Sequence, residues 1–110
     1  MALSQHTTQD VLILTPGQKL TAAEGKEDLS RAVHGALEAG VRKILLDCSA
    51  VEFIDSLGVG QIVASFVSTR NRGGRLVLCG LRPRIVLVLR MASLHLVLDM
   101  RATGADEVVW

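Results

Sequence analysis

The stretch Phe53-Ile54-Asp55-Ser56-Leu57-Gly58-Val59-Gly60 lies in the middle of the chain, between an apolar run and a helical pattern. The run before it, residues 43–47, is typical of a buried strand. After it, five apolar residues recur with the spacing of one helix face: Val59, Ile62, Val63, Phe66 and Val67. Asp55 and Ser56 therefore stand at a predicted helix start. Both are preferred N-caps, because a side-chain oxygen there accepts a hydrogen bond from an unpaired backbone N–H.

The hydroxyl of Ser56 is a candidate phosphate carrier. A helix N-terminus offers unpaired N–H groups and a partial positive charge to an anion. Gly58 and Gly60 remove two side chains from the beginning of the predicted helix. We expect this to leave the Ser56 hydroxyl open to another protein.

Composition favours one folded domain covering residues 1–110. Apolar residues make up 49% of the chain, which argues against disorder. Charge is unevenly spread, because residues 56–98 hold six arginines and no acid, whereas residues 1–55 carry a net charge of −3. This basic part fits an acidic partner surface or a phosphate ligand, and a solvated arginine face is the alternative.

Periodicity predicts an alternation of strands and helices. Strands are expected at residues 11–14, 18–20, 42–47, 75–79 and 96–98, and helices at 22–39, at 57–72 and from Pro83 onward. The first helix is expected to begin with a capping box at residues 21–24. The strand, helix and strand of residues 42–79 predict two parallel strands, with Ser56 at their carboxyl edge. The helix after Pro83 is apolar nearly all round, so it is either sandwiched or exposed to a partner.

Metal and cofactor sites are not expected. The three histidines fall on different predicted elements, and Cys48 and Cys79 form no C-x-x-C pair. Both cysteines lie in strand-like runs and are predicted to be reduced core residues. A dinucleotide loop is disfavoured because Val63 stands where G-x-G-x-x-G needs its third glycine.

Catalysis and nucleic-acid binding are also disfavoured. A serine nucleophile at Ser56 would need a base held by a third group, and His95 with Asp99 is the one plausible pair in the later sequence. We therefore expect no enzyme activity. The arginines lie on different elements without interleaved aromatic residues, so direct nucleic-acid binding is not expected.

The sequence predicts a cytoplasmic protein without membrane insertion. Its most apolar segment, residues 85–98, is shorter than a membrane span and contains Arg90 and His95. The N-terminal residues have neither the basic nor the apolar region of a secretory signal.

Three segments together resemble the STAS domain of bacterial anti-sigma factor antagonists. They are residues 43–47, the block 53–60 and the stretch Arg70-Asn71-Arg72-Gly73-Gly74-Arg75-Leu76. The resemblance extends from the first strand to about Met100. It implies an α/β fold with a small mixed sheet of four or five strands and three to four helices packed on it. The tail after Met100 is short, so the family's last helix is expected to be a stub or missing, leaving apolar surface for a partner or a second copy.

In the family that this chain resembles, the serine directly after the motif aspartate is phosphorylated by an anti-sigma factor that is itself a serine kinase. A phosphatase restores it, and the unphosphorylated domain binds the kinase. The resemblance thus implies Ser56 as the acceptor, with Asp55, Ser56, Leu57, Gly58 and Val59 as the partner-binding segment. The alternative is a scaffold or accessory subunit, as in a stressosome-like or lipid-transport complex, in which Ser56 only caps a helix. A homodimer is compatible with either role.

Overall fold

A mixed five-stranded sheet forms the centre of the computed structural model, which describes residues 3–21 and 29–110. Its strands lie in the order β1-β2-β4-β6-β7. Their bounds are Leu3–Thr8 for β1, Val11–Pro16 for β2, Lys43–Asp47 for β4, Arg75–Cys79 for β6 and Asp99–Met100 for β7. β1 pairs antiparallel with β2, and the other neighbours are parallel. A separate pair of short parallel strands joins β3 (Lys19–Leu20) to β5 (Phe53–Ile54).

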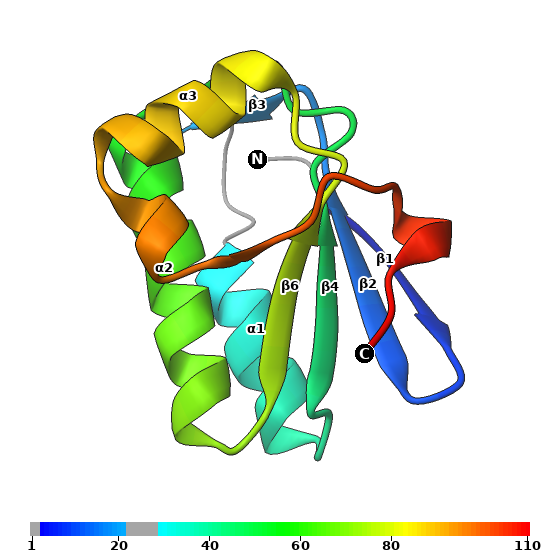
Figure 1. Cartoon of the computed structure of the whole chain (residues 1–110). Coiled ribbons are helices and arrows are strands. Elements are labelled where there is room, and N and C mark those ends of the chain that lie inside the picture. The colour runs from blue at the N-terminus through cyan, green and yellow to red at the C-terminus, as the bar shows by residue number, and fades with distance from the viewer. Residues whose placement is uncertain (1–2, 22–28) are drawn as a thin grey trace.

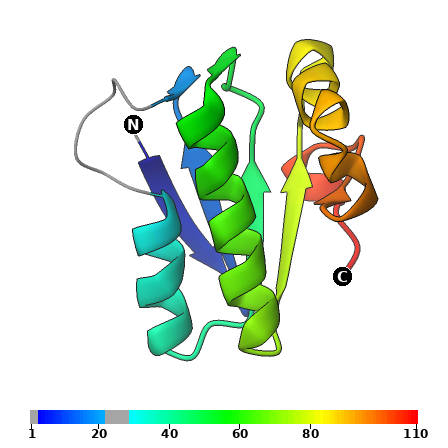
Figure 2. The same ribbon diagram turned by 90° about the vertical axis from the view of Figure 1, so that its left-hand side faces the viewer.

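Three α-helices belong to the described part of the chain: α1 (Leu29–Glu38), α2 (Ser56–Asn71) and α3 (Pro83–Met91). α1 and α2 lie side by side on one face of the sheet, and α3 lies beside the N-terminal half of α2 (Figures 1 and 2). The predicted α/β class, with a mixed sheet of four to five strands, is confirmed. The parallel pairing of residues 43–47 with 75–79 and the helix start at Pro83 are confirmed as well.

The central strands are apolar on both faces because both faces are covered, as is usual for parallel strands. On the helix side, Ile44, Leu46, Leu76 and Leu78 join the main core with Ile62 of α2. The opposite side carries a smaller buried cluster of Val11, Leu45, Val77 and Cys79. Alternation along each strand sends neighbouring side chains to these two cores.

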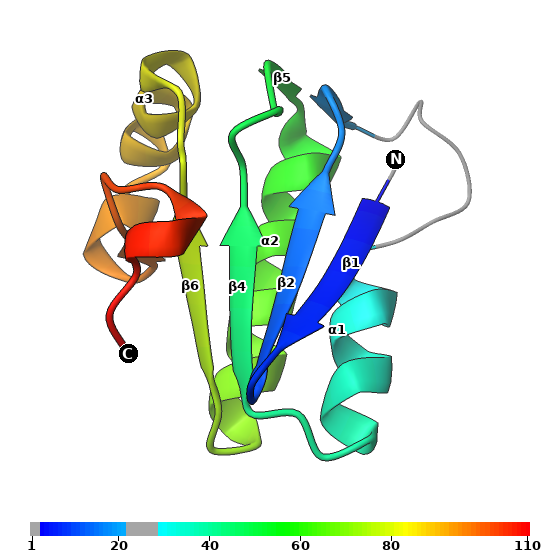
Figure 3. The ribbon, with the colours of Figure 1, turned by 90° about the vertical axis from the view of Figure 1, so that its right-hand side faces the viewer.

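The C-terminal segment covers this second face. Ala105, Val108 and Trp110 pack against the smaller cluster, and Figure 3 shows the segment lying over β6, on the face opposite α1 and α2. The Arg75 guanidinium carbon lies 5.7 Å from the centre of the Trp110 ring, within the range of a cation–π contact. A short 3₁₀ helix, Ala105–Glu107, stands in this segment. The last helix is thus a stub, as expected, but the tail itself covers this face, which corrects the expectation that the short tail leaves apolar surface there for a partner or a second copy.

Three strands differ from the prediction, since β1 and the short β5 were not predicted and the last strand was misplaced. β1 was not predicted, because it is an exposed edge strand whose residues after Leu3 are polar. The strand expected at residues 96–98 is wrong: Leu94–Leu96 form a 3₁₀ helix, and the pairing with β6 is made by Asp99–Met100 instead. The turn begins at Ser93, whose φ of 60° ends the helical path of α3. The capping box at residues 21–24 and the beginning of the first helix lie outside the described residues.

The buried face of α2 also differs from the prediction. Gly58, Ile62, Ser65 and Thr69 are buried, whereas Val67 is 45% exposed. The two polar residues are tolerated because each hydroxyl donates to the carbonyl one turn earlier, Ser65 to Gln61 and Thr69 to Ser65, both at 2.7 Å. α2 thus packs through small side chains and leaves part of its apolar surface outside.

Cys48 and Cys79 are free and buried, as predicted, but they belong to different cores. Burial raises the pKa of the Cys48 thiol far above its usual value and that of Cys79 to about 11. Because the thiolate is the reactive form, both should resist alkylation in the folded protein.

We predict that Val108→Ala combined with Trp110→Ala makes Cys79 reactive at pH 8 and leaves Cys48 protected. The two substitutions uncover the face on which Cys79 lies, while the helices still cover Cys48. Iodoacetamide labelling of the native protein, read by mass spectrometry of the two cysteine peptides, measures this. Equal protection of both thiols in the double variant would contradict the role assigned to the C-terminal segment.

Candidate functional site at the start of helix α2

A single carboxylate defines where α2 begins. Asp55 has extended backbone angles, with φ of −113° and ψ of −177°, and its Oδ1 accepts a 2.8 Å hydrogen bond from the Gly58 N–H. Its carbonyl accepts from the Val59 N–H at 2.9 Å. Asp55 is therefore the N-cap and Ser56 is the first helical residue. The sequence predicted that either residue could be the N-cap. Because Asp55 is the cap, capping does not explain why a serine stands at position 56.

Gly58 is held against the backbone of β3. A Cβ at this position would lie 1.9 Å from the Leu20 carbonyl oxygen and 3.0 Å from the Ile54 side chain. By contrast, a Cβ at Gly60 would meet nothing within 4 Å. A glycine is thus required at position 58 for α2 to pack closely on Leu20. The predicted role of Gly58, to leave the approach to Ser56 open, does not account for this requirement.

The segment Asp55–Val59 divides into exposed and buried residues. Ser56 is exposed and Leu57 is 59% exposed, whereas Asp55 and Val59 are half-buried and Gly58 is buried. Phe53, just before the cap, is 46% exposed. A partner that binds this segment can therefore reach Ser56 as well as two exposed apolar side chains close to it in sequence.

The site lies at the carboxyl end of the parallel strands, as predicted. Figure 2 shows the N-terminus of α2 at the end of the sheet to which the strand arrows point. The β3–β5 pairing holds the segment there, and the Glu52 and Phe53 N–H groups both donate to the Gln18 carbonyl, at 2.8 and 3.1 Å. These backbone contacts hold in place the segment that leads to Ser56.

Sequence reasoning missed a polar network beside this site. The Glu52 carboxylate accepts a hydrogen bond from the Gln18 amide and forms a 3.8 Å ion pair with Arg82. Arg82 also donates through Nε to the Ser49 carbonyl at 3.2 Å. These contacts link the loop before β5 to the beginning of α3. The signal available in the sequence was the lone acid Glu52 between the two apolar residues Val51 and Phe53.

Asp99, which was considered as the partner of a catalytic His95, is paired with two arginines. The Asp99 carboxylate is bound by Arg101 at 2.7 Å and by Arg75 at 3.4 Å, and these two arginines lower its pKa. His95 is exposed on the 3₁₀ helix. Within residues 3–21 and 29–110, no group of three or more His, Cys, Asp or Glu side chains is arranged to hold a metal ion. In the same part of the chain, no helix is both long and apolar enough to cross a membrane.

Comparison with known proteins decides the family. Residues 2–107 match the model of the STAS domain. The chain belongs to the STAS domain family. A Thermotoga neapolitana relative, named a homologue of the candidate anti-sigma factor antagonist TM1081, is 32% identical over 91% of this chain and 88% of its own. The anti-sigma-B factor antagonist of Listeria monocytogenes is 30% identical over 90% of this chain and 85% of its own.

The predicted STAS fold is confirmed by solved structures. SpoIIAA, an anti-sigma factor antagonist of Bacillus, has been solved unphosphorylated and phosphorylated. The unphosphorylated form superposes with a TM-score of 0.76 at 18% identity, covering 96% of this chain and 93% of its own. The phosphorylated form gives 0.69 at 19% identity, covering 92% of each chain. At this identity, the likeness concerns the fold.

We predict opposite effects of alanine at the two glycines of this STAS domain. Gly58→Ala should lower Tm by roughly 5–15 °C, since forcing extra volume into a packed contact costs about 1–3 kcal/mol. Gly60→Ala is the matched control and should leave Tm unchanged or raise it, because alanine favours the helix by up to about 1 kcal/mol. Thermal unfolding followed by circular dichroism measures both. Equal Tm values for the two variants would show that the Leu20 contact does not constrain the site.

Proposed function

We propose that this protein is an anti-sigma factor antagonist controlled by phosphorylation of Ser56. In its unphosphorylated form it binds an anti-sigma factor serine kinase and so frees a sigma factor for transcription. Phosphorylation by that kinase ends the binding, and a phosphatase restores it. The domain has no catalytic activity of its own in this scheme. The observation that carries the proposal is the exposed Ser56, held as the first residue of α2 directly after its capping aspartate.

The relatives support the regulatory role. The Listeria monocytogenes protein is named an anti-sigma-B factor antagonist, and SpoIIAA is named in both an unphosphorylated and a phosphorylated form. This chain covers at least 85% of the Listeria relative and shares its family. A modification of the same kind on this chain needs an accessible hydroxyl, which Ser56 supplies.

The surface around Ser56 is suited to a docking protein. Leu57 and Phe53 are large apolar side chains that remain 59% and 46% exposed. Exposed apolar side chains that form one continuous patch often mark interaction sites. We infer that they make the apolar contacts with the kinase, while Gly58 and Asp55 hold the segment in shape. Val59 contributes mainly through the packing beneath it.

Charge explains how the switch would work. A phosphate adds about −1.5 to −2 charges at neutral pH. The first turn of α2 has N–H groups without intrahelical acceptors, and Asp55 uses the one at Gly58. The remaining N–H groups favour an anion, whereas the Asp55 carboxylate repels it and directs it outward toward the partner. A loss of ~3 kcal/mol at the interface lowers affinity more than a hundredfold.

The test is binding by variants that add or remove one charge. Ser56→Ala should bind the cognate kinase like the wild type, and Ser56→Asp should bind at least tenfold more weakly. Ser68→Asp is the matched control, because it adds the same charge to the same helix about three turns away and should keep wild-type affinity. Ser56→Ala and Ser56→Asp should melt within about 2 °C of the wild type, since an acid in the first turn is favourable, whereas Ser68→Asp places an acid on a half-buried residue of the last turn and should melt lower without losing affinity. Surface plasmon resonance and thermal unfolding give the two readouts.

One outcome would favour the alternative function. If Ser56→Asp and Ser56→Ala bind the same partners with the same affinity, the protein is a STAS scaffold or accessory subunit. In that case Leu57 and Phe53 would mediate docking without any switch. An unfolded Ser56→Asp variant would contradict the claim that the helix start tolerates the charge.

A further inference from the structure

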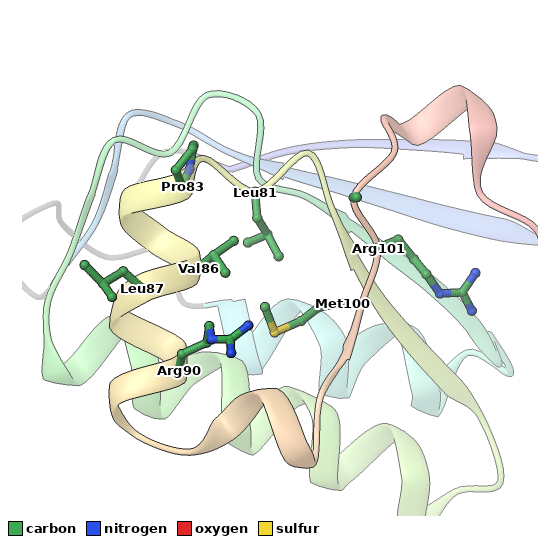
Figure 4. A pocket seen from close by; sticks show the side chains of 8 residues that line it. Leu81, Pro83, Val86, Leu87, Arg90, Met100 and Arg101 are labelled. Carbon is green, nitrogen blue, oxygen red and sulfur yellow. The ribbon is translucent and has the colours of Figure 1, made fainter.

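A cavity of about 480 Å³ lies between α3 and the chain at residues 100–102. Its walls are largely aliphatic, and Figure 4 shows Leu81, Val86 and Met100 directed into it from three different elements. Ala102 completes the wall opposite α3. This volume falls within the range of roughly 300–1,000 Å³ that small-molecule pockets occupy. The cavity is thus large enough for a ligand with an apolar body.

One positive charge is available at the mouth of this cavity. Arg90 extends from the last turn of α3 toward Met100, and no acidic residue lines the cavity (Figure 4). Arg90 is exposed, and its guanidinium makes no hydrogen bond or ion pair with the described residues. Arg101 also lines the cavity, but its guanidinium points away and is bound to the Asp99 carboxylate and the Val109 carbonyl.

An apolar cavity with a single available guanidinium favours an anionic ligand that has an apolar body. The planar fork of an arginine matches a carboxylate, which can accept two parallel hydrogen bonds from it. We propose that the cavity binds a monocarboxylate with an unbranched aliphatic tail. The tail lies among Leu81, Val86 and Met100, and the carboxylate pairs with Arg90.

This site is independent of the one at Ser56. None of the residues Asp55–Val59 lines the cavity, and the cavity is formed by α3 and the C-terminal part of the chain. Binding of the acid can therefore be measured on the unphosphorylated protein without any partner. Failure here would leave the proposal for Ser56 untouched, and the reverse also holds.

Decanoate, used below its micelle concentration, is the probe, and decanol is its neutral counterpart. In ¹⁵N–¹H spectra of the full chain, decanoate should shift the amide signals of Val86, Arg90 and Ala102 in a saturable manner. Arg90→Gln should weaken decanoate binding about tenfold, as expected for the loss of a charge-assisted hydrogen bond, and should leave decanol binding unchanged. Arg84→Gln is the matched control, because Arg84 is exposed on the same helix and does not line the cavity.

Filling the cavity gives a second, independent test. Val86→Phe should abolish binding of both ligands. Ala102→Leu should also abolish binding. Because Ala102 is exposed, this substitution should have little effect on the stability of the fold. The proposal is overturned if decanoate produces no saturable shifts, or if its affinity is the same in wild type and Arg90→Gln. Amide shifts confined to the exposed Leu96 and Val97 would also overturn it. So would a cavity that binds an acidic peptide or a second copy of the chain but does not bind decanoate.

Discussion

The start of α2 depends on one hydrogen bond and one close backbone approach. Asp55 accepts from the Gly58 N–H, and the absence of a side chain at Gly58 lets the helix rest on the Leu20 carbonyl. An N-cap of this kind contributes about 1 kcal/mol, which is modest. Its larger effect is geometric: Asp55 is still extended after β5, which pairs with β3, and the helix begins at the next residue, Ser56. The hydroxyl is thereby held in a fixed, exposed position.

The rest of the fold makes this position rigid. β4 and β6 are covered on one face by α1 and α2, and the C-terminal segment packs on the other, so the middle of each strand is buried. The Glu52–Arg82 pair connects the loop before the site to α3. A charge added at Ser56 therefore meets a scaffold that has no need to rearrange. We therefore expect that phosphorylation changes the charge at Ser56 and leaves the rest of the fold as it is, so a partner responds to that local charge.

Sequence reasoning found the parts of the fold that have a strong local pattern. The middles of β4 and β6 are continuous apolar runs, and α2 ends at Asn71, shortly before Gly73-Gly74, so their type and order followed from periodicity and turn residues. β1 was missed because an exposed edge strand needs no apolar alternation. The strand near the C-terminus was misplaced because an apolar triplet, residues 96–98, is equally compatible with a 3₁₀ turn followed by one buried residue, Leu98.

The sequence predicted that Asp55 and Ser56 lie at a helix start, but not the contacts that hold this segment in place. Asp55, Ser56 and the nearby glycines are recognisable from their spacing at a helix start. The assignment of the cap to Asp55 rather than Ser56 requires the actual backbone angles. The role of Gly58 depends on Leu20, which is distant in sequence, and the burial of Ser65 and Thr69 depends on hydroxyls that bond within the helix. None of these contacts leaves a local pattern.

The most direct test of the account is the mass of the protein isolated from its own cells, followed by peptide mapping across residues 53–70. We predict a fraction that carries one phosphate, located on Ser56, and none on Ser65, Ser68 or Thr69. Absence of phosphate under every growth condition, or a phosphate on one of those other residues, would contradict the claim that the start of α2 presents Ser56 for modification.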